Sequence, residues 1–154
     1  MNIRIKGIAH ERTEDAPFMG ALISAIDCHI DCKGCFNQHL KNESTIILDS
    51  KTIIREVLKN PFNKGIILGG LEWTEQPEEM KELIKIALEN NLQVILYTGL
   101  SEDMFNKKFS DICKLNIYIK YGNYDEQCKT QELKCYGVKM ASNNQTINKC
   151  GDKI

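Results

Sequence analysis

The sequence predicts an α/β fold in which a mostly parallel sheet curves into a partial, open (β/α) barrel. Short apolar runs of strand length alternate with amphipathic segments of helical spacing, the pattern typical of βαβ units. Right-handed crossovers would curl such strands into an arc. The runs number about four or five, too few to close an eight-stranded barrel. With 154 residues the chain suits a single domain, 1–154, with a real core.

The first strands are predicted near the N-terminus. Residues 1–9 alternate apolar and polar side chains, which indicates a short edge strand, and the charged segment 10–15 reads as a loop. Residues 19–26 are apolar almost throughout, as expected for a strand buried on both faces of a parallel sheet.

A helix is predicted next, with Ser50 as its N-cap and Pro61 at its end. Residues 65–68 then form a short apolar strand. Thr74 is predicted to cap a second helix that runs through Pro77 to about Asn90.

The second half repeats this alternation. Residues 92–97 are predicted as a strand, and Ser101 caps a helix whose apolar face extends to Cys113. Residues 115–119 form the next strand, a polar loop follows, and residues 136–140 form a last short strand.

Composition excludes several classes of protein. Lys and Arg number 20 against 21 acidic residues, and no basic stripe stands out, so nucleic acid is not an expected partner. No apolar run approaches the roughly 18 residues of a membrane span, and the N-terminus lacks a signal-like apolar region. We therefore expect a cytoplasmic protein with no membrane partner. Seven cysteines, three of them clustered, do not suit a disulfide scaffold and fit reduced thiols better.

The clustered cysteines are Cys28, Cys32 and Cys35, directly after the strand predicted at 19–26. Three thiolates this close in one loop can bind a single metal centre. Zinc sites usually take four protein ligands, whereas a 4Fe-4S cluster held by three cysteines leaves one iron open to a ligand from solution. A zinc site completed by a distant Cys or His, or three unrelated thiols, are the alternatives. Ligands of α/β folds sit beyond the carboxyl ends of parallel strands, where this loop begins.

The C-x3-C-x2-C spacing of this triad is the hallmark of the radical S-adenosylmethionine (radical SAM) enzymes. Residues 32–37, Cys-Lys-Gly-Cys-Phe-Asn, resemble the C-x-G-C-[YF]-N form of the anaerobic (class III) ribonucleotide reductase activating proteins. The segment 136–145 also resembles one near the end of those activases. The resemblance implies a trimmed radical SAM barrel that binds a 4Fe-4S cluster and SAM.

The resemblance also implies the chemistry. SAM would chelate the open iron through its amino and carboxylate groups, and one electron would split its sulfonium C–S bond. The 5'-deoxyadenosyl radical would then take a hydrogen from a glycine Cα of a protein partner, the large subunit of anaerobic ribonucleotide reductase. An external one-electron donor is required. No catalytic side chain is expected, because the chemistry belongs to the cofactors.

Two further motifs resemble parts of a SAM site. Gly69 and Gly70 follow a strand and resemble the Gly-Gly-Glu motif that holds the amino group of SAM, with Leu71 inserted before Glu72. A simple turn is the alternative. Thr98 lies in a Tyr-Thr-Gly sequence like that of the activases, where its hydroxyl could bind SAM or cap its own turn.

Within the cysteine loop, Gly34 and Phe36 flank the last predicted ligand. In radical SAM enzymes the backbone there meets the adenine, so both residues are predicted SAM contacts. Ordinary core packing is the alternative for Phe36.

The other histidines and cysteines have weaker assignments. His29 and His39 are conceivable extra ligands, although a lone histidine in a polar loop is more often solvated. Cys113 is expected to pack as a small hydrophobe on a helix. Three cysteines near the C-terminus could form a second metal site. They are Cys128, Cys135 and Cys150.

Three rival functions share parts of these observations. A radical SAM enzyme acting on a small molecule, such as a deazapurine synthase, would keep the cluster and need no protein partner. An activase of another glycyl-radical enzyme would differ only in its partner. A zinc-binding interaction module is the non-enzyme alternative.

Overall fold

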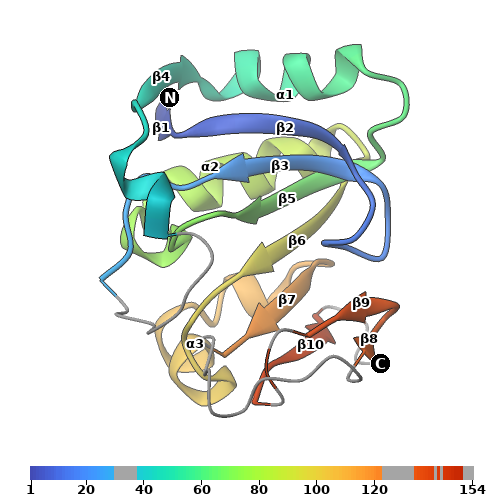
Figure 1. Ribbon diagram of the computed structural model, residues 1–154. Helices are drawn as coiled ribbons and strands as arrows, with labels where there is room; N and C mark the ends of the chain where they lie inside the picture. Colours follow the sequence, from blue (N-terminus) through green and yellow to red (C-terminus); the bar gives the residue numbers. More distant parts are fainter. Residues whose placement is uncertain (30–37, 123–133, 141, 143, 151–154) are drawn as a thin grey trace.

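The computed structural model describes residues 1–29, 38–122, 134–140, 142 and 144–150. These residues form a mixed α/β fold with a six-stranded, mostly parallel sheet and three α-helices (Figure 1). The strands are β1 (Asn2–Ile5), β2 (Gly7–Arg12), β3 (Gly20–Ser24), β4 (Ile46–Asp49), β5 (Gly65–Gly69), β6 (Gln93–Tyr97), β7 (Tyr118–Tyr121), β8 (Lys134–Cys135), β9 (Val138–Lys139) and β10 (Thr146–Lys149). The helices are α1 (Ser50–Lys59), α2 (Pro77–Glu89) and α3 (Glu102–Lys108), with the short 3-10 helices η1 (Gln38–Asn42), η2 (Trp73–Glu75) and η3 (Ile112–Lys114).

The main sheet has the strand order β10-β7-β6-β5-β3-β2. Its four central strands are parallel, and the two outer strands run antiparallel to their neighbours. Helices α2 and α3 provide the crossovers from β5 to β6 and from β6 to β7. The α/β class predicted from the alternation is therefore confirmed, while the curvature into an open barrel stays a prediction.

The N-terminal segment differs from the single edge strand predicted at 1–9. It forms two strands in two sheets, with β1 paired to β4 and β2 paired to β3. Strand β2 continues to Arg12, so the loop predicted at 10–15 begins later. Its register shifts between Ala9 and Arg12, where Glu11 has a φ of 55°. Strand β4 was not predicted, although its Ile-Ile-Leu run has the composition of a strand; its partner lies more than forty residues away.

The C-terminal segment also differs from its prediction. The strand predicted at 136–140 is a hairpin of β8 and β9, turned at Tyr136 and Gly137 with φ values of 51° and 79°. An unpredicted strand, β10, follows and pairs with β7. Strand β7 itself begins at Tyr118, three residues later than predicted.

Helix α1 begins one residue from its predicted cap. Asp49 is the N-cap, with its Oδ2 accepting a hydrogen bond from the backbone N–H of Lys51 at 3.0 Å, and Ser50 is the first helical residue. Both residues are good caps, so the sequence alone did not separate them.

Of the two N-caps predicted for the later helices, one is confirmed and the other is wrong. Ser101 caps α3 as predicted, with its Oγ 3.3 Å from the backbone nitrogen of Met104, but α3 ends at Lys108 and does not extend to Cys113. Thr74 lies in η2 rather than at the cap of α2, which starts at Pro77. Proline suits this first position because it has no N–H to satisfy.

Apolar side chains bury both faces of the main sheet. The larger core lies between the sheet and the helices. The opposite face is covered by the β2–β3 loop and the C-terminal segment. This second core consists of Ala16, Phe18, Ile67, Ile95, Val138, Met140 and Ile147. Among the described residues, no helix is long and apolar enough to cross a bilayer.

Gly65 should be intolerant of a side chain, because β5 approaches β6 and Phe18 closely there. A Cβ at Gly65 would lie 2.3 Å from the backbone oxygen of Gln93 and 2.5 Å from Phe18 Cε2. We expect Gly65→Ala to lower the free energy of unfolding by about 1–3 kcal/mol or more, measured by urea denaturation under anaerobic conditions. Gly7→Ala is the matched control, since a Cβ at Gly7 would meet nothing within 4 Å. Equal stability of the two variants would contradict this packing.

Candidate functional site

The carboxyl ends of β3, β5 and β6 meet at one edge of the sheet, which we call the rim (Figure 1). Most of the described predicted site residues lie there. Cys28 follows β3, Gly69 ends β5 with Gly70 and Glu72 after it, and Thr98 follows β6. Four others lie outside the described residues: Cys32, Gly34, Cys35 and Phe36.

The chain enters the cysteine loop through a backbone segment, residues 25–29, that is clamped to residues 69–76. Cys28 itself is partly buried against the larger core, and its N–H donates to Asp27 Oδ1 at 2.8 Å. The contacts of the clamp are Ala25 N–H to Gly69 O (3.0 Å), Ile26 N–H to Gln76 Oε1 (3.0 Å), Glu72 N–H to Asp27 O (2.9 Å) and His29 N–H to Glu75 Oε1 (3.1 Å). Four hydrogen bonds, made by Ala25, Ile26, Asp27 and His29, thus fix where the cysteine loop begins.

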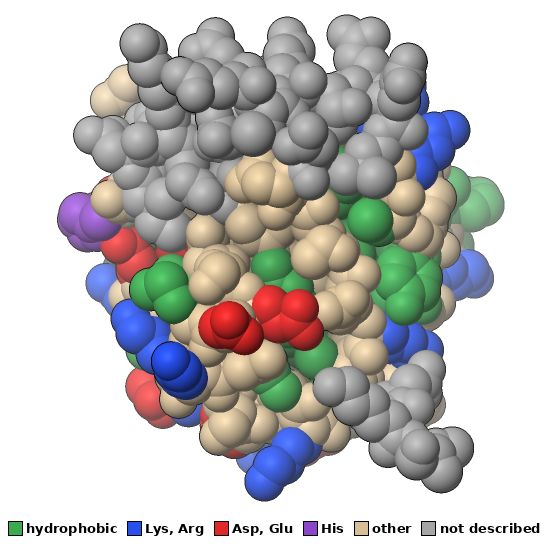
Figure 2. Space-filling view, turned by 90° about the horizontal axis from the view of Figure 1, so that it is seen from below, with side chains coloured by type: hydrophobic (Ala, Val, Ile, Leu, Met, Phe, Trp, Pro, Cys, Tyr) green, Lys and Arg blue, Asp and Glu red, His purple; other side chains and the backbone are tan. Residues whose placement is uncertain are grey.

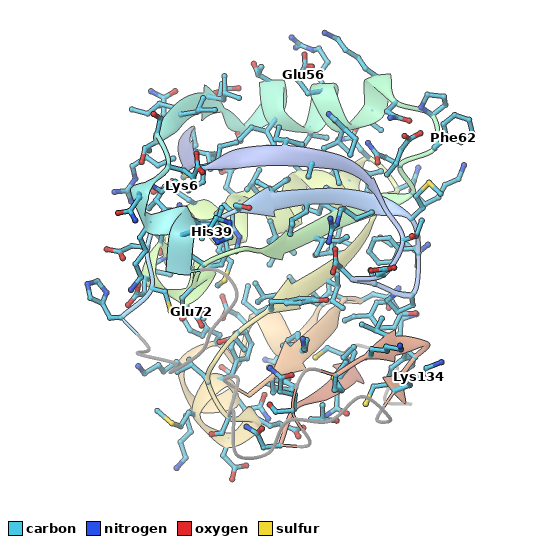
Figure 3. All side chains as sticks on the ribbon, viewed as in Figure 1. Lys6, His39, Glu56, Phe62, Glu72 and Lys134 are labelled. Carbon is cyan, nitrogen blue, oxygen red and sulfur yellow. The ribbon has the colours of Figure 1, made fainter. Side chains whose placement is uncertain are left out.

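The segment after the cysteine loop is anchored by Lys6, at the junction of β1 and β2. Its ammonium donates to the backbone oxygen of Glu43 at 2.6 Å and to Thr45 Oγ1 at 3.2 Å. Figure 3 shows Lys6 and His39 close to the rim side that carries Glu72, whereas Phe62 and Lys134 lie on the opposite side. Both flanks of the loop are therefore attached to the main fold.

Gly70 has two reasons to be glycine. Its φ is 78°, a conformation that side chains rarely adopt. A Cβ there would also lie 2.6 Å from both Cβ and Oγ of Ser24. The backbone of the glycine pair therefore packs directly against the end of β3.

Glu72 is 4% exposed and binds two loops through its carboxylate. Its Oε1 accepts the N–H of Gly99 at 2.6 Å, and its Oε2 accepts the Oγ1–H and N–H of Thr74 at 2.8 and 3.3 Å. Whether Glu72 contacts SAM stays a prediction.

Thr98 is 5% exposed, and its hydroxyl oxygen accepts the N–H of Leu100 at 3.1 Å. Its own N–H donates to Lys120 O at 2.9 Å. The hydroxyl thus caps its own turn, the alternative that the sequence left open, and a contact to SAM stays a prediction.

The strand registers place four residues in one row across the ends of the parallel strands. Ser24 pairs with Gly69, Tyr97 pairs with Lys120, and a Cβ on Gly69 would lie 3.8 Å from Tyr97 Cβ. Their side chains alternate with those of the larger core, so the row belongs to the face of the second core. This row combines a hydroxyl, a bare glycine, a phenol and an ammonium.

Lys120 is a cationic residue of this row that the sequence analysis did not single out. Its ammonium lies 4.4 Å from the centroid of the Tyr97 ring. No ion pair to it occurs within the described part of the chain, and burial lowers its pKa to about 8. The sequence contained one signal for it. Every second residue of β7 is buried against the larger core, and Lys120 lies between two such residues, so it belongs to the other face.

His29 is exposed and lies between two carboxylates. Its Nδ1 is 2.5 Å from Glu75 Oε1 and its Nε2 is 3.7 Å from Asp27 Oδ2, and the hydrogen bond to Glu75 raises its pKa. These three side chains offer ligand atoms within 4.8 Å of one another. The same contacts also bind the end of the clamp, so His29 has a structural role without a metal. His39 is exposed in η1.

The described C-terminal cysteines are divided between the faces of the sheet. Cys150 packs in the larger core, and Cys135 packs against the second core. This separation argues against a metal site that both would share; Cys128 lies outside the described residues. Cys113 packs against the larger core as expected, and burial followed by the nearby Cys150 raises its pKa to about 11.

The described residues on the α3 side of the molecule mix acidic, basic and apolar side chains, without a continuous field of one sign among them (Figure 2). This agrees with the near-neutral charge of the chain, with 20 basic and 21 acidic residues.

Comparison with protein-family models gives one match. Residues 20–148 match the 4Fe-4S single cluster domain, a domain found in radical SAM-type proteins. The matched region begins with β3 and includes the cysteine loop and the whole rim. A search of curated proteins gives no significant match. Because the family match covers most of the chain, the protein belongs to the 4Fe-4S single cluster domain family, which supports an iron-sulfur cofactor.

Gln76 should be essential to the clamp, because its buried side chain joins β1 to the segment that precedes Cys28. Its Oε1 accepts from Ile26, and its Nε2 donates to Arg4 O at 2.9 Å. Gln76→Leu leaves both backbone groups unpaired, so we expect a loss of about 2–6 kcal/mol of unfolding free energy, at 1–3 kcal/mol for each group. Amide exchange of residues 25–29 should accelerate.

The control for this variant is Gln93→Leu, at an exposed position at the start of β6. We expect its stability to stay within about 0.5 kcal/mol of the parent and its exchange at residues 25–29 to be unchanged. Similar effects of the two substitutions would show that Gln76 does not hold the clamp.

Proposed function

We propose that this member of the 4Fe-4S single cluster domain family is a radical SAM activase that installs a glycyl radical on anaerobic ribonucleoside-triphosphate reductase. One observation carries the proposal: the segment that leads to Cys28 leaves the rim beside the glycine pair. Its Ala25 is hydrogen-bonded to Gly69, and Ile26 to Gln76. The family match adds the cluster, and the resemblance of the triad adds SAM.

The described part of the site fits a cluster bound at the rim. Cys28 is partly buried, and the clamp fixes the backbone on its N-terminal side. Two more thiols follow within seven residues, and thiolates are the usual ligands of Fe–S clusters. Cys28, Cys32 and Cys35 would hold the cluster.

When bound, the cluster would supply the electron that cleaves SAM to methionine and a 5'-deoxyadenosyl radical, which removes a hydrogen atom from the partner's glycine Cα. The chain's own residues bind and orient SAM. In this proposal Gly69 and Gly70 bring bare backbone to its methionine part, and Thr98 lies at the neighbouring strand end. Gly34 and Phe36 would contact the adenine.

Lys120 extends the proposed SAM site. Its ammonium lies in the last row of the sheet and has the Tyr97 ring as its neighbour. It makes no ion pair among the described residues, and the Asp15 carboxylate only partly offsets the effect of burial on its charge. Burying such a cation is unfavourable unless an anion joins it. The carboxylate of SAM is the anion that the proposed reaction would bring there.

The glycyl-radical partner rests on the resemblance alone, as does the need for an external one-electron donor. A small-molecule radical SAM enzyme, an activase of another glycyl-radical enzyme and a zinc module remain as outcomes of the tests below.

The first test is anaerobic reconstitution of the full chain. We expect a brown protein with about four iron and four sulfide per chain that cleaves SAM to 5'-deoxyadenosine after reduction with dithionite. Cys32→Ala should lose the cluster and the cleavage, whereas the control Cys135→Ala should keep both. With the reductase large subunit, a glycine-radical signal should appear by electron paramagnetic resonance.

Each rival function gives a result that differs from that of the proposed one. A colourless protein with zinc and no sulfide would identify the zinc module, and a Cys32→Ala variant that still cleaves SAM would refute the cluster assignment. SAM cleavage without a radical on the reductase would redirect the search to another glycyl-radical enzyme or to a small-molecule substrate.

The second test addresses Lys120. We expect Lys120→Met to weaken SAM binding to the reconstituted protein roughly tenfold to a hundredfold, the loss of one charged hydrogen bond, without lowering stability. Decarboxylated SAM should bind the parent and the variant equally. Because Lys120 loses its proton as the pH rises through about 8, SAM affinity of the parent should fall above that pH. Lys120→Arg should keep its affinity to higher pH.

Equal SAM affinities of the parent and Lys120→Met would remove Lys120 from the site and leave the activase proposal intact.

A further inference from the structure

We infer that Glu72 is a positioning residue, which fixes the loops of the rim relative to one another and does not itself contact the ligand. The inference rests on the proposed SAM site and assigns Glu72 a different task from the ligand contact that its motif suggests.

The carboxylate of Glu72 is already occupied by the protein. Oε1 accepts from Gly99 at 2.6 Å, and Oε2 accepts from both polar groups of Thr74, at 2.8 and 3.3 Å. Hydrogen bonds to an ionised carboxylate are the stronger kind, and a contact to a ligand ammonium would compete with them. With 4% of the residue exposed, Glu72 also has little surface left for a ligand.

These bonds connect three separate loops. The carboxylate joins the loop after β5, through Thr74, to the loop after β6, through Gly99. The backbone N–H of Glu72 donates to Asp27 O at 2.9 Å, in the segment that leads to Cys28. Glu72 is therefore a common anchor for the loops after β3, β5 and β6.

The inserted Leu71 explains this orientation. Leu71 is 8% exposed and packs in the larger core, so the chain must turn inward after Gly70. That turn brings the Glu72 carboxylate next to the loop after β6, where it accepts the N–H of Gly99. The glycine pair remains at the rim, where Gly69 O accepts the N–H of Ala25.

The experiment compares SAM with an analogue that lacks the α-amino group, using equilibrium dialysis against the reconstituted full chain. Glu72→Gln keeps an oxygen for Gly99 and an amide that can donate to the Thr74 hydroxyl, and loses only the longer contact to the Thr74 N–H at 3.3 Å, so it should bind SAM within about threefold of the parent. Glu72→Ala breaks the anchor and should weaken both ligands equally, by roughly tenfold to a hundredfold.

Thr74→Val provides an arm that leaves the Glu72 charge in place. The substitution removes the hydroxyl that donates to Oε2. If Glu72 acts by positioning the loops, this variant should bind both ligands more weakly than the parent. Affinities are measured at a temperature where every variant is folded, because a purely structural role would lower the melting temperature and leave the affinity of the folded protein unchanged.

A direct contact to the SAM amino group gives the opposite pattern. Glu72→Gln would then lose as much SAM affinity as Glu72→Ala, both variants would lose the preference for SAM over the analogue, and Thr74→Val would bind normally. That result would overturn the inference.

Amide exchange keeps the inference testable if the proposed function fails. A parent protein that binds no SAM would refute the SAM site alone. Protection of the Gly99 amide should still be high in the parent and in Glu72→Gln and lost in Glu72→Ala; equal protection in all three would refute the anchor.

Discussion

The parallel pairing of β3 with β5 is the interaction on which the rest of the site depends. It continues past the strands, because the N–H of Ala25 bonds to the oxygen of Gly69 and the next residues bond to the segment as far as Gln76. This pairing requires a glycine at position 70, where a side chain would collide with Ser24. The glycine pair therefore has a structural role that does not depend on a ligand. The pairing of β3 with β5 also determines where the cysteine loop begins.

The sequence predicted the parts of this arrangement that local patterns encode. The apolar runs at β3, β5 and β6 and the helices between them follow from residue spacing, and the parallel class then brings their carboxyl ends to one edge. Strands β4 and β10 were not predicted. Most of their side chains are only half-buried or exposed, and both pair with strands that do not neighbour them in sequence. The contact between Glu72 and Gly99 spans 27 positions and depends on the path of the chain after Leu71, which no spacing rule contains.

Two ionisable side chains at the rim, Glu72 and Lys120, differ in how the protein satisfies their hydrogen bonds and charge. Glu72 is buried with three donors from the chain itself, so it is complete without a ligand. Lys120 has an aromatic ring as its close neighbour, and burial disfavours its charged form. A buried charge that is fully hydrogen-bonded inside the protein stabilises the local structure, whereas a charge without a direct ion pair is suited to an anion from outside.

The irregularity of β2 has a consequence for the molecule as a whole. The main sheet ends at β2 within the described residues, and such an outer strand presents backbone donors and acceptors that another chain could pair with. The shift of register before Arg12, the φ of 55° at Glu11 and the exposed charged side chains there interrupt this row. The distortion thus guards against edge-to-edge aggregation, which would otherwise compete with correct assembly during synthesis.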